Sequence, residues 1–157
     1  MLAQHTTDQC TATPLFALPH AQDPSRIEQQ LTEACVLAHQ GQLMEAQDAF
    51  CRVLDQDATN LDALLSLAHI CRVGRNFAEA VELLEEARRH HPHSADVIAA
   101  LSLVALELGY ESGARRLLDQ LDRVSPGHPE RTEIVGRLSY RSATSYRSAP
   151  SRRSALA

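Results

Sequence analysis

The sequence predicts an all-α fold built from three successive helical hairpins, and three observations predict it. An internal repeat is visible because Glu45-Ala46, Glu79-Ala80 and Gly113-Ala114 follow one another at intervals of 34 residues. Apolar residues recur within each copy at the spacing of one helix face. Aromatic residues make up only 4% of the chain and Trp is absent, so Leu and Ala must fill the core between stacked helices.

Aligning three registers from Ile27, Leu61 and Ala95 shows further agreement between the copies. The eighth residue is small in each copy: Ala34, Ala68 and Ser102. The twenty-fourth is large and apolar, and the twenty-seventh is apolar: Phe50, Leu84 and Leu118, then Val53, Ala87 and Leu121. Small residues let two helices approach while larger residues fill the space between them, so these positions predict contacts within each hairpin.

This 34-residue helix–turn–helix pattern resembles the tetratricopeptide repeat, and the resemblance extends over about Ile27 to His128. The first copy departs from the family pattern at Gln30 and Glu33, where the family prefers large apolar residues. The resemblance implies a right-handed α-solenoid with repeats at 27–60, 61–94 and 95–128.

Local signals mark the helix ends. Ser25 followed by Glu28 fits a capping box, and Pro24 suits the first turn of a helix. Asn60 and Ser94 are candidate N-caps of the second and third hairpins. Three glycines stand where the paired helices must be joined by a turn, and glycine tolerates the positive φ that such turns use: Gly41, Gly74 and Gly109.

Residues 129–139 predict a short capping helix after the third repeat. A stack of hairpins would otherwise leave the apolar flank of its last pair in water. Ile134, Val135 and Leu138 fall at helical spacing, although Gly136 weakens the helix. With this helix, the predicted repeat domain spans residues 25–139.

We predict that the two ends of the chain have no fixed structure. Residues 1–24 are rich in Thr, Gln, Ala and Pro and read as a flexible arm, in which the apolar segment Pro14 to Pro19 is a candidate docking element. Residues 140–157, rich in Ser, Arg and Ala, have too little apolar surface to offset the entropy lost on ordering. This tail is either a solvating segment or a basic, phosphorylatable interaction arm.

Charge and cysteine content exclude several classes of function. Residues 1–138 carry eleven Arg and twenty acids, while 139–157 carry four Arg and no acid. An acidic body argues against nucleic acid as a ligand, and no stretch is long and apolar enough to cross a membrane. The four cysteines show no C-x-x-C spacing and Met1 to Gln9 shows no secretory signal, which favours the cytoplasm.

The resemblance also implies a binding surface. In the family, the first helix of each pair lines a concave groove at fixed repeat positions. Those positions hold Leu31, Cys35, Ala38, Leu65, His69, Arg72, Ala99, Leu103 and Leu106 in this chain. An acid recurs at the second position of each repeat as a candidate groove rim: Glu28, Asp62 and Asp96. These same acids also suit the positive end of a helix dipole.

A mostly apolar groove favours a protein partner that presents an extended apolar segment. The Lys, Arg and Asn clamp with which co-chaperones of this family hold C-terminal carboxylates is absent. Two functions are therefore candidates. The first is a scaffold subunit of a larger assembly. The second is a chaperone, because three repeats with an N-terminal arm and a short C-terminal helix resemble the small chaperones that bind hydrophobic translocators in bacterial type III secretion. A second copy of the chain is a further candidate partner, in a homodimer.

Enzymatic chemistry is not expected. The sequence holds no phosphate-binding glycine loop, no G-x-S-x-G motif and no H-E-x-x-H metal helix. His90, His91 and His93 gather at a predicted helix end, where cations suit the helix dipole, and Cys35 and His69 belong to different helices. We therefore predict no enzyme activity, no cofactor and no metal site.

Overall fold

The computed structural model describes residues 24–147 of the 157-residue chain, with side chains to Arg141. In this range the chain forms seven α-helices and no strand, so the predicted all-α class is confirmed. The helices are α1 Pro24–His39, α2 Leu43–Leu54, α3 Leu61–Val73, α4 Phe77–His90, α5 Ala95–Glu107, α6 Glu111–Val124 and α7 Arg131–Arg147. The predicted arm, with its Pro14 to Pro19 segment, and the last ten residues lie outside the described residues.

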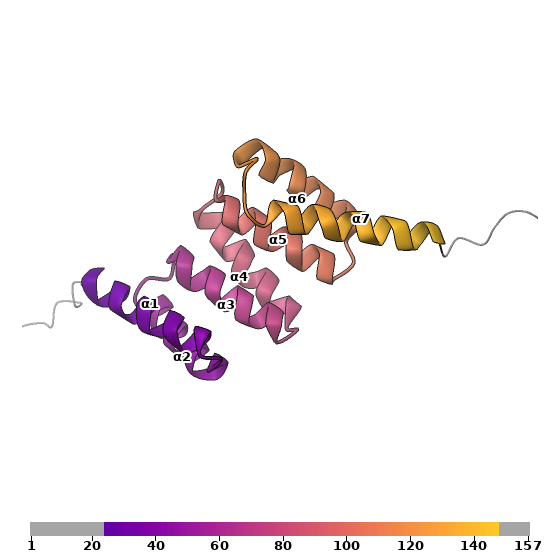
Figure 1. Cartoon of the computed structure of the whole chain (residues 1–157). Helices are drawn as coiled ribbons and strands as arrows, with labels where there is room; N and C mark the ends of the chain where they lie inside the picture. Colours follow the sequence, from indigo (N-terminus) through magenta and orange to yellow (C-terminus); the bar gives the residue numbers. More distant parts are fainter. Residues whose placement is uncertain (1–23, 148–157) are drawn as a thin grey trace, which may run out of the picture.

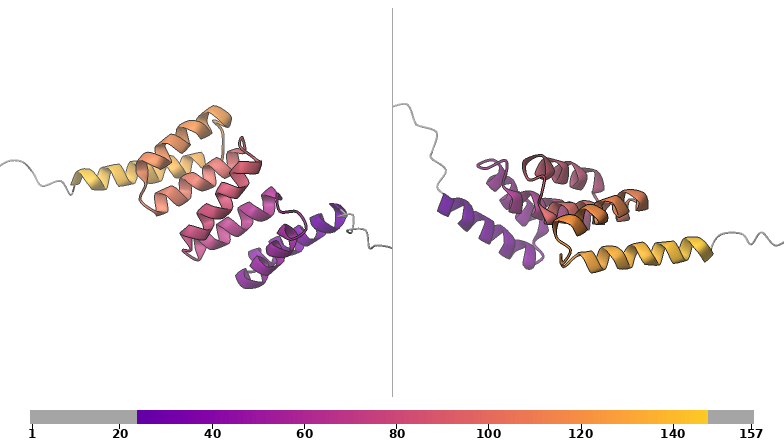
Figure 2. Two further views of the ribbon diagram at one scale, coloured as in Figure 1. Left: turned by 180° about the vertical axis from the view of Figure 1, so that it is seen from behind. Right: turned by 90° about the horizontal axis from the view of Figure 1, so that it is seen from above.

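Six helices pair into three antiparallel hairpins, α1–α2, α3–α4 and α5–α6, which stack in sequence order (Figure 1). Each odd-numbered helix contacts the next odd-numbered helix, so α1, α3, α5 and α7 form one layer and α2, α4 and α6 form the other. Figure 2 shows the stack from behind and from above, with α7 lying across the last hairpin and its C-terminal end projecting beyond it.

Three buried clusters hold the stack together, and each is shared by a hairpin and the helix that follows it. The first joins α1, α2 and α3 around Phe50, and the second joins α3, α4 and α5 around Leu64 and Leu84. The third joins α5, α6 and α7 around Leu121 and Ile134. Because every core needs a helix from the next unit, the last hairpin needs α7 to complete its own.

The eighth repeat position explains how closely the helices of a hairpin approach. Ala34, Ala68 and Ser102 expose only 0%, 2% and 0% of their surfaces, respectively. The Ser102 hydroxyl donates a hydrogen bond of 2.9 Å to the carbonyl of Ile98 within α5, so its burial leaves no polar atom unsatisfied. The small residues predicted from the register therefore do set the helix contacts.

Two predicted N-caps are confirmed and one is wrong. The Asn60 side chain accepts a hydrogen bond from the Ala63 amide at 3.1 Å, and the Ser94 hydroxyl accepts one from the Val97 amide at 3.4 Å. Ser25 lies inside the first turn of α1, which begins at Pro24, so it is not the cap. Proline is favoured at the first helical position because its missing N–H has no helical acceptor there, which extends α1 past the expected cap.

The turn between paired helices uses a left-handed residue at repeat position 15. Gly41 and Gly109 adopt φ values of 78° and 82°, and Arg75 adopts 62° at the equivalent position. The assignment of Gly74 as the turn glycine is therefore wrong: Gly74 has φ −71° and caps α3 one residue earlier. The Arg75 guanidinium lies 5.5 Å from the centre of the Phe77 ring, a cation–π contact that offsets part of its backbone strain.

We expect Gly109→Ala and Gly74→Ala to change stability in opposite directions. A side chain in the left-handed region at position 109 costs about 1–2 kcal/mol. At position 74 the added Cβ meets only the Ile70 and Cys71 carbonyls at ordinary contact distances of 3.5 and 3.6 Å, so Ala gains about 0.4–1 kcal/mol by restricting the unfolded chain. Urea denaturation of both variants measures the difference, and equal destabilisation would contradict the assigned turn geometry.

The capping helix is longer than predicted. It runs from Arg131 to Arg147, whereas the sequence indicated an end at 139 and a disordered tail from 140. The physical reason is that no proline or glycine follows Gly136 until Pro150, so nothing in the sequence stops the helix. Ion pairs join α7 to the last hairpin, since Arg137 donates to Glu107 at 2.6 Å and Arg131 to Asp122 at 2.5 Å.

Candidate peptide-binding site

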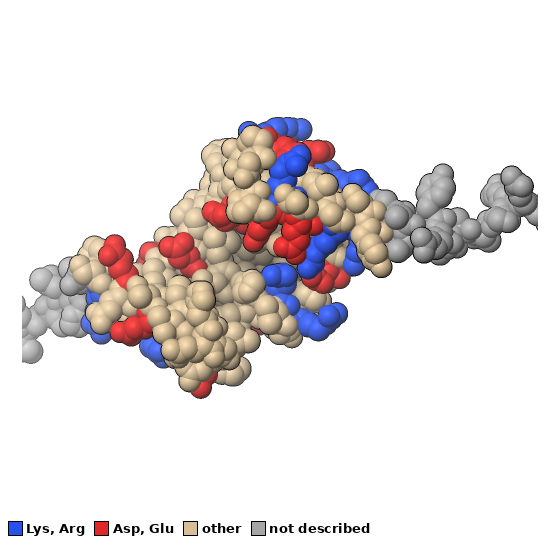
Figure 3. All heavy atoms as spheres, in the orientation of Figure 1, with Lys and Arg blue, Asp and Glu red and all other residues tan. Residues whose placement is uncertain are grey.

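Two neighbouring pockets lie on the layer formed by the odd-numbered helices, one on each side of α3. The α1–α3 pocket has a volume of about 420 Å³ and the α3–α5 pocket a volume of about 400 Å³. Leu65 and His69 line both, so the two pockets adjoin across α3, and together they are called the groove. In Figure 3 this face of the molecule is hollowed at its centre.

The α1–α3 pocket is formed by the C-terminal half of α1, by two residues of α2, and by α3 from its middle to its end. Its lining is apolar or uncharged apart from two histidines: Cys35, Ala38, His39, Leu43, Phe50, Leu65, Ser66, His69, Ile70 and Val73. Val73 and Leu43 stay partly exposed at its edge, while Phe50 is buried beneath it. An exposed apolar strip of this kind is characteristic of a surface that binds another molecule.

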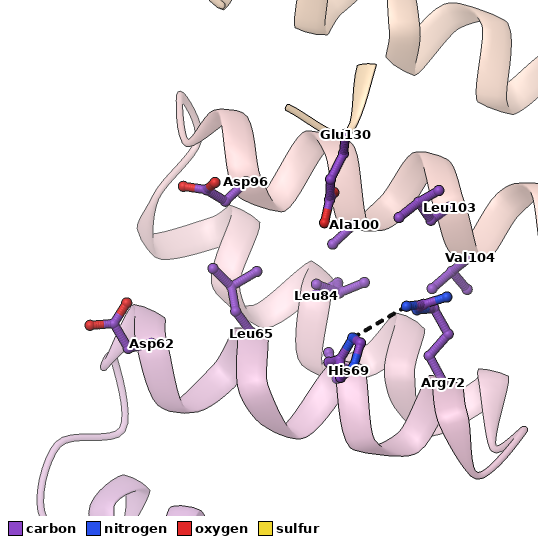
Figure 4. Close-up of a pocket in the computed structure, with 11 residues that line it drawn as sticks. Asp62, Leu65, His69, Arg72, Leu84, Asp96, Ala100, Leu103, Val104 and Glu130 are labelled. Atoms are coloured by element: carbon purple, nitrogen blue, oxygen red, sulfur yellow. Dashed lines mark hydrogen bonds between the residues drawn. The ribbon is translucent and has the colours of Figure 1, made fainter. Parts of the chain in front are cut away.

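The α3–α5 pocket differs from its neighbour in charge. It is lined by Asp62, Leu65, Ala68, His69, Arg72, Leu84, Asp96, Ala100, Leu103, Val104 and Glu130. Figure 4 shows Asp62 and Asp96 at one end, at the starts of α3 and α5, and Arg72 at the other end. Glu130 precedes α7 and points down toward Ala100.

The structure brings most of the predicted residues of the first two repeats to this surface. Cys35, Ala38, Leu65, His69 and Arg72 line one or both pockets and keep part of their surface accessible. Leu31 is half-buried against the first core, and the rim residue Glu28 is exposed on α1; neither lines a pocket. The rim residues Asp62 and Asp96 lie at the α3–α5 pocket.

The structure corrects the prediction that the groove extends over the third repeat. Ala99, Leu103 and Leu106 expose 0%, 3% and 1% of their surfaces. They pack in the same cluster as Ile134 and Leu138, so α7 covers the face of α5 that the family pattern leaves open. Leu103 contributes only to the floor of the α3–α5 pocket, and Ala99 and Leu106 line neither pocket.

Sequence reasoning missed Ala100, Val104 and Glu130. Ala100 and Val104 each follow a predicted residue by one position. The exposed face of α5 is shifted in this way because α7 covers one side of the helix and leaves the neighbouring side to the pocket. The apolar residues of α7 could have predicted this shift, because they already indicated that a capping helix covers part of the third repeat. Glu130 gives no such signal, because its place depends on the path of the loop before α7.

The histidine in the centre of the groove has a defined tautomer. His69 Nδ1 lies 3.2 Å from the Arg72 guanidinium, which can only donate, so Nδ1 accepts and Nε2 carries the proton. Partial burial, followed by the positive charge of Arg72, lowers the pKa of His69. His69 is therefore neutral at pH 7 and offers an N–H donor to a ligand.

The carboxylates around the α3–α5 pocket have different partners. His128 Nε2 donates to Asp96 at 3.0 Å, which ties the loop before α7 to the start of α5. Burial raises the pKa of Glu130, because its carboxylate is partly removed from water. Beyond the pocket, the hydrogen bond from Arg137 lowers the pKa of Glu107, which also lies 3.9 Å from Arg72.

The histidines near the end of α4 bond to protein groups. His90 bonds to Glu86 at 2.9 Å, and His91 bonds to the Thr59 carbonyl at 2.8 Å, joining the loops of two repeats. Within the described residues, no three His, Cys, Asp or Glu side chains gather as a metal site. No helix in the same part of the chain is long and apolar enough to cross a membrane.

Comparison with solved structures supports the architecture. A tetratricopeptide repeat protein from Parabacteroides merdae superposes with TM-score 0.68 at 15% identity over 78% of this chain, which spans about half (48%) of that structure. The first such domain of Spaghetti (RPAP3), bound to an HSP90 peptide, gives 0.69 at 17% identity, covering 77% of this chain and 96% of the domain. The Yersinia enterocolitica type III secretion chaperone SycD, in complex with a peptide of the translocator YopD, gives 0.66 at 16% identity, covering 80% and 96%.

A family model agrees with the repeat found in the sequence. The tetratricopeptide repeat model matches residues 75–138, which contain α4, α5, α6 and the start of α7. The 34-residue register carries the same hairpin back through α1 to α3, with small residues at position 8 and left-handed turns at position 15. Residues 75–138 match the family model, and the described part of the chain has the fold of a tetratricopeptide repeat solenoid, with three hairpins and a C-terminal capping helix.

Proposed function

We propose that this protein is a protein-interaction module whose groove binds an extended, mainly apolar segment of a partner protein, and that it serves as a scaffold subunit of a larger assembly. The observation that carries the proposal is the pair of adjoining pockets across α3, which share Leu65 and His69. An extended peptide presents successive side chains to such pockets, and a few of them give most of the binding energy. We place this role in the cytoplasm.

The groove does not fit acidic C-terminal tails. The two repeat positions at which family co-chaperones carry a basic clamp hold Leu31, Leu65 and Ala99, then Cys35, His69 and Leu103. His69 is held neutral beside Arg72. The partner segment that the groove favours is therefore apolar and not a carboxylate-terminated acidic tail.

A type III secretion-type chaperone for a hydrophobic translocator is the second candidate. The fold likeness to SycD in complex with a YopD peptide favours it. The two candidates differ in what the partner does alone. A chaperone client is insoluble or membrane-active without this protein, whereas an assembly subunit remains soluble.

Replacing Leu65 by Glu tests the groove. Leu65 is partly exposed and lines both pockets, while its other side packs against the core around Leu64 and Leu84, so the added carboxylate should repel an apolar segment from the groove. Peptides selected from a random library by the wild-type protein should lose at least about tenfold in affinity for the variant, measured by fluorescence polarisation.

The control for this experiment is Met44→Glu. Met44 is 72% exposed on α2 and lines neither pocket, so the same substitution there should leave peptide affinity unchanged. Circular dichroism should show equal helicity for both variants. If the Leu65 variant bound the selected peptides as tightly as the wild type, the groove would not be the binding site.

A further inference from the structure

We infer that the groove selects partner segments that carry a basic side chain beside an apolar one. The apolar side chain enters the α1–α3 pocket, and the Lys or Arg side chain enters the α3–α5 pocket. This inference rests on the proposed function and adds a chemical requirement to it.

The two pockets differ in charge although they adjoin. The lining of the α1–α3 pocket contains no Asp, Glu or Arg. The lining of the α3–α5 pocket contains the carboxylates of Asp62, Asp96 and Glu130 against the guanidinium of Arg72. One half of the groove is therefore suited to an uncharged side chain, and the other half has an excess of negative charge.

Position along the pocket separates two of these three carboxylates, those of Asp62 and Asp96, from Arg72. Asp62 and Asp96 lie at the end formed by the starts of α3 and α5, and Arg72 lies at the opposite end (Figure 4). Arg72 already faces His69 at 3.2 Å and Glu107 at 3.9 Å. Arg72 also acts on Glu130, which lies between the two ends, so only Asp62 and Asp96 are left without a balancing cation from the pocket lining.

The carboxylates of Asp62, Asp96 and Glu130 can each accept a further hydrogen bond. His128 occupies one oxygen of Asp96. Among the described residues, the side-chain carboxylates of Asp62 and Glu130 accept no hydrogen bond. Partial burial of Glu130 disfavours its charged form, as its raised pKa indicates, so an incoming ammonium or guanidinium would relieve an existing cost.

The floor beneath these carboxylates suits the rest of a basic side chain. Leu65 and Ala100 lie between Asp62 and Glu130 in Figure 4, Leu103 lines the pocket beyond Glu130, and all three are apolar. Lys and Arg bury their aliphatic stems on apolar surface while keeping the charged group at a polar edge. A purely apolar side chain would instead cover the carboxylates without pairing them, which is costly.

The experiment uses the full chain and short synthetic peptides with fluorescein labels. Each peptide carries one Leu and, at varied separation in a Ser and Gly background, one Lys, Thr or Glu. At the best separation, the Lys peptide should bind at least about tenfold more tightly than the matched Glu peptide. Because the preference is electrostatic, it should diminish as salt is raised.

Asp62→Asn combined with Glu130→Gln tests the assignment to this pocket. The double variant should lose most of the Lys-over-Glu preference while still requiring Leu. Glu45→Gln combined with Asp119→Asn removes the same charge from exposed positions on α2 and α6 outside the pockets, and it should keep the full preference. Asp96 is left in place in both, because it holds His128.

Each outcome has a distinct meaning. If Leu peptides bind and Leu65→Glu weakens them, but Lys and Glu peptides bind equally, the inference is wrong and the groove function stands. If the preference persists in the Asp62 and Glu130 double variant, the basic side chain binds elsewhere and the inference is also wrong. If Leu65→Glu changes the binding of no peptide, the proposed function fails as well.

Discussion

Replacing Ile134 by Asp should undock α7 and unfold the third repeat. Ile134 is fully buried in the cluster that joins α5, α6 and α7, where it packs with Leu103, Leu106 and Leu121. The substitution removes a large apolar side chain and places a carboxylate in a site without a partner. We expect it to lower the free energy of unfolding by at least about 4 kcal/mol. Urea denaturation followed by circular dichroism measures this loss.

Thr132→Asp is the matched control for the cap. Thr132 is exposed in the first turn of α7, where a negative charge is favoured by the helix dipole. This variant introduces the same carboxylate two residues away and should retain wild-type stability. If the two variants denatured at the same urea concentration, α7 would not be an integral part of the fold.

Replacing Phe50 by Ala should have the largest effect within the first repeat. Phe50 is the largest side chain of the cluster shared by α1, α2 and α3, and it is 1% exposed. Removing a buried Phe costs about 3–5 kcal/mol, because apolar surface is lost and a cavity remains. Typical proteins are stable by only about 5–15 kcal/mol, so thermal denaturation should show a marked fall in the midpoint.

Met44→Ala shows whether that loss comes from the core. Met44 lies on the same helix but is 72% exposed, so truncating it should change stability by no more than about 0.5 kcal/mol. A Phe50 variant that was no less stable than the Met44 variant would show that the first hairpin does not pack against α3 as described.

The repeat register predicted most of the fold because it reports contacts that recur with every hairpin. The small residues at position 8 and the caps at Asn60 and Ser94 depend only on neighbouring parts of the chain, and the structure confirms them. The left-handed turn at Arg75 was missed because a glycine stands one residue before it. Composition favoured Gly74, whereas strict periodicity pointed to position 75.

The candidate site was less predictable because it depends on how the end of the stack is closed. Family positions assume that the first helix of every repeat faces solvent, but α7 buries Ala99 and Leu106. The same helix brings Glu130 to the pocket. These contacts join residues about 30 positions apart through a loop whose direction no local pattern specifies.

Closure by α7 also limits the length of the accessible groove. The accessible surface extends from α1 across α3 to α5 and stops where Ile134 and Leu138 cover the third repeat. Neighbouring helices lie about 8–10 Å apart and an extended chain rises about 3.3 Å per residue, so this distance corresponds to roughly five or six residues. If the proposed function holds, we expect the groove to contact a partner segment of this length, and residues beyond it to add nothing to recognition on this face.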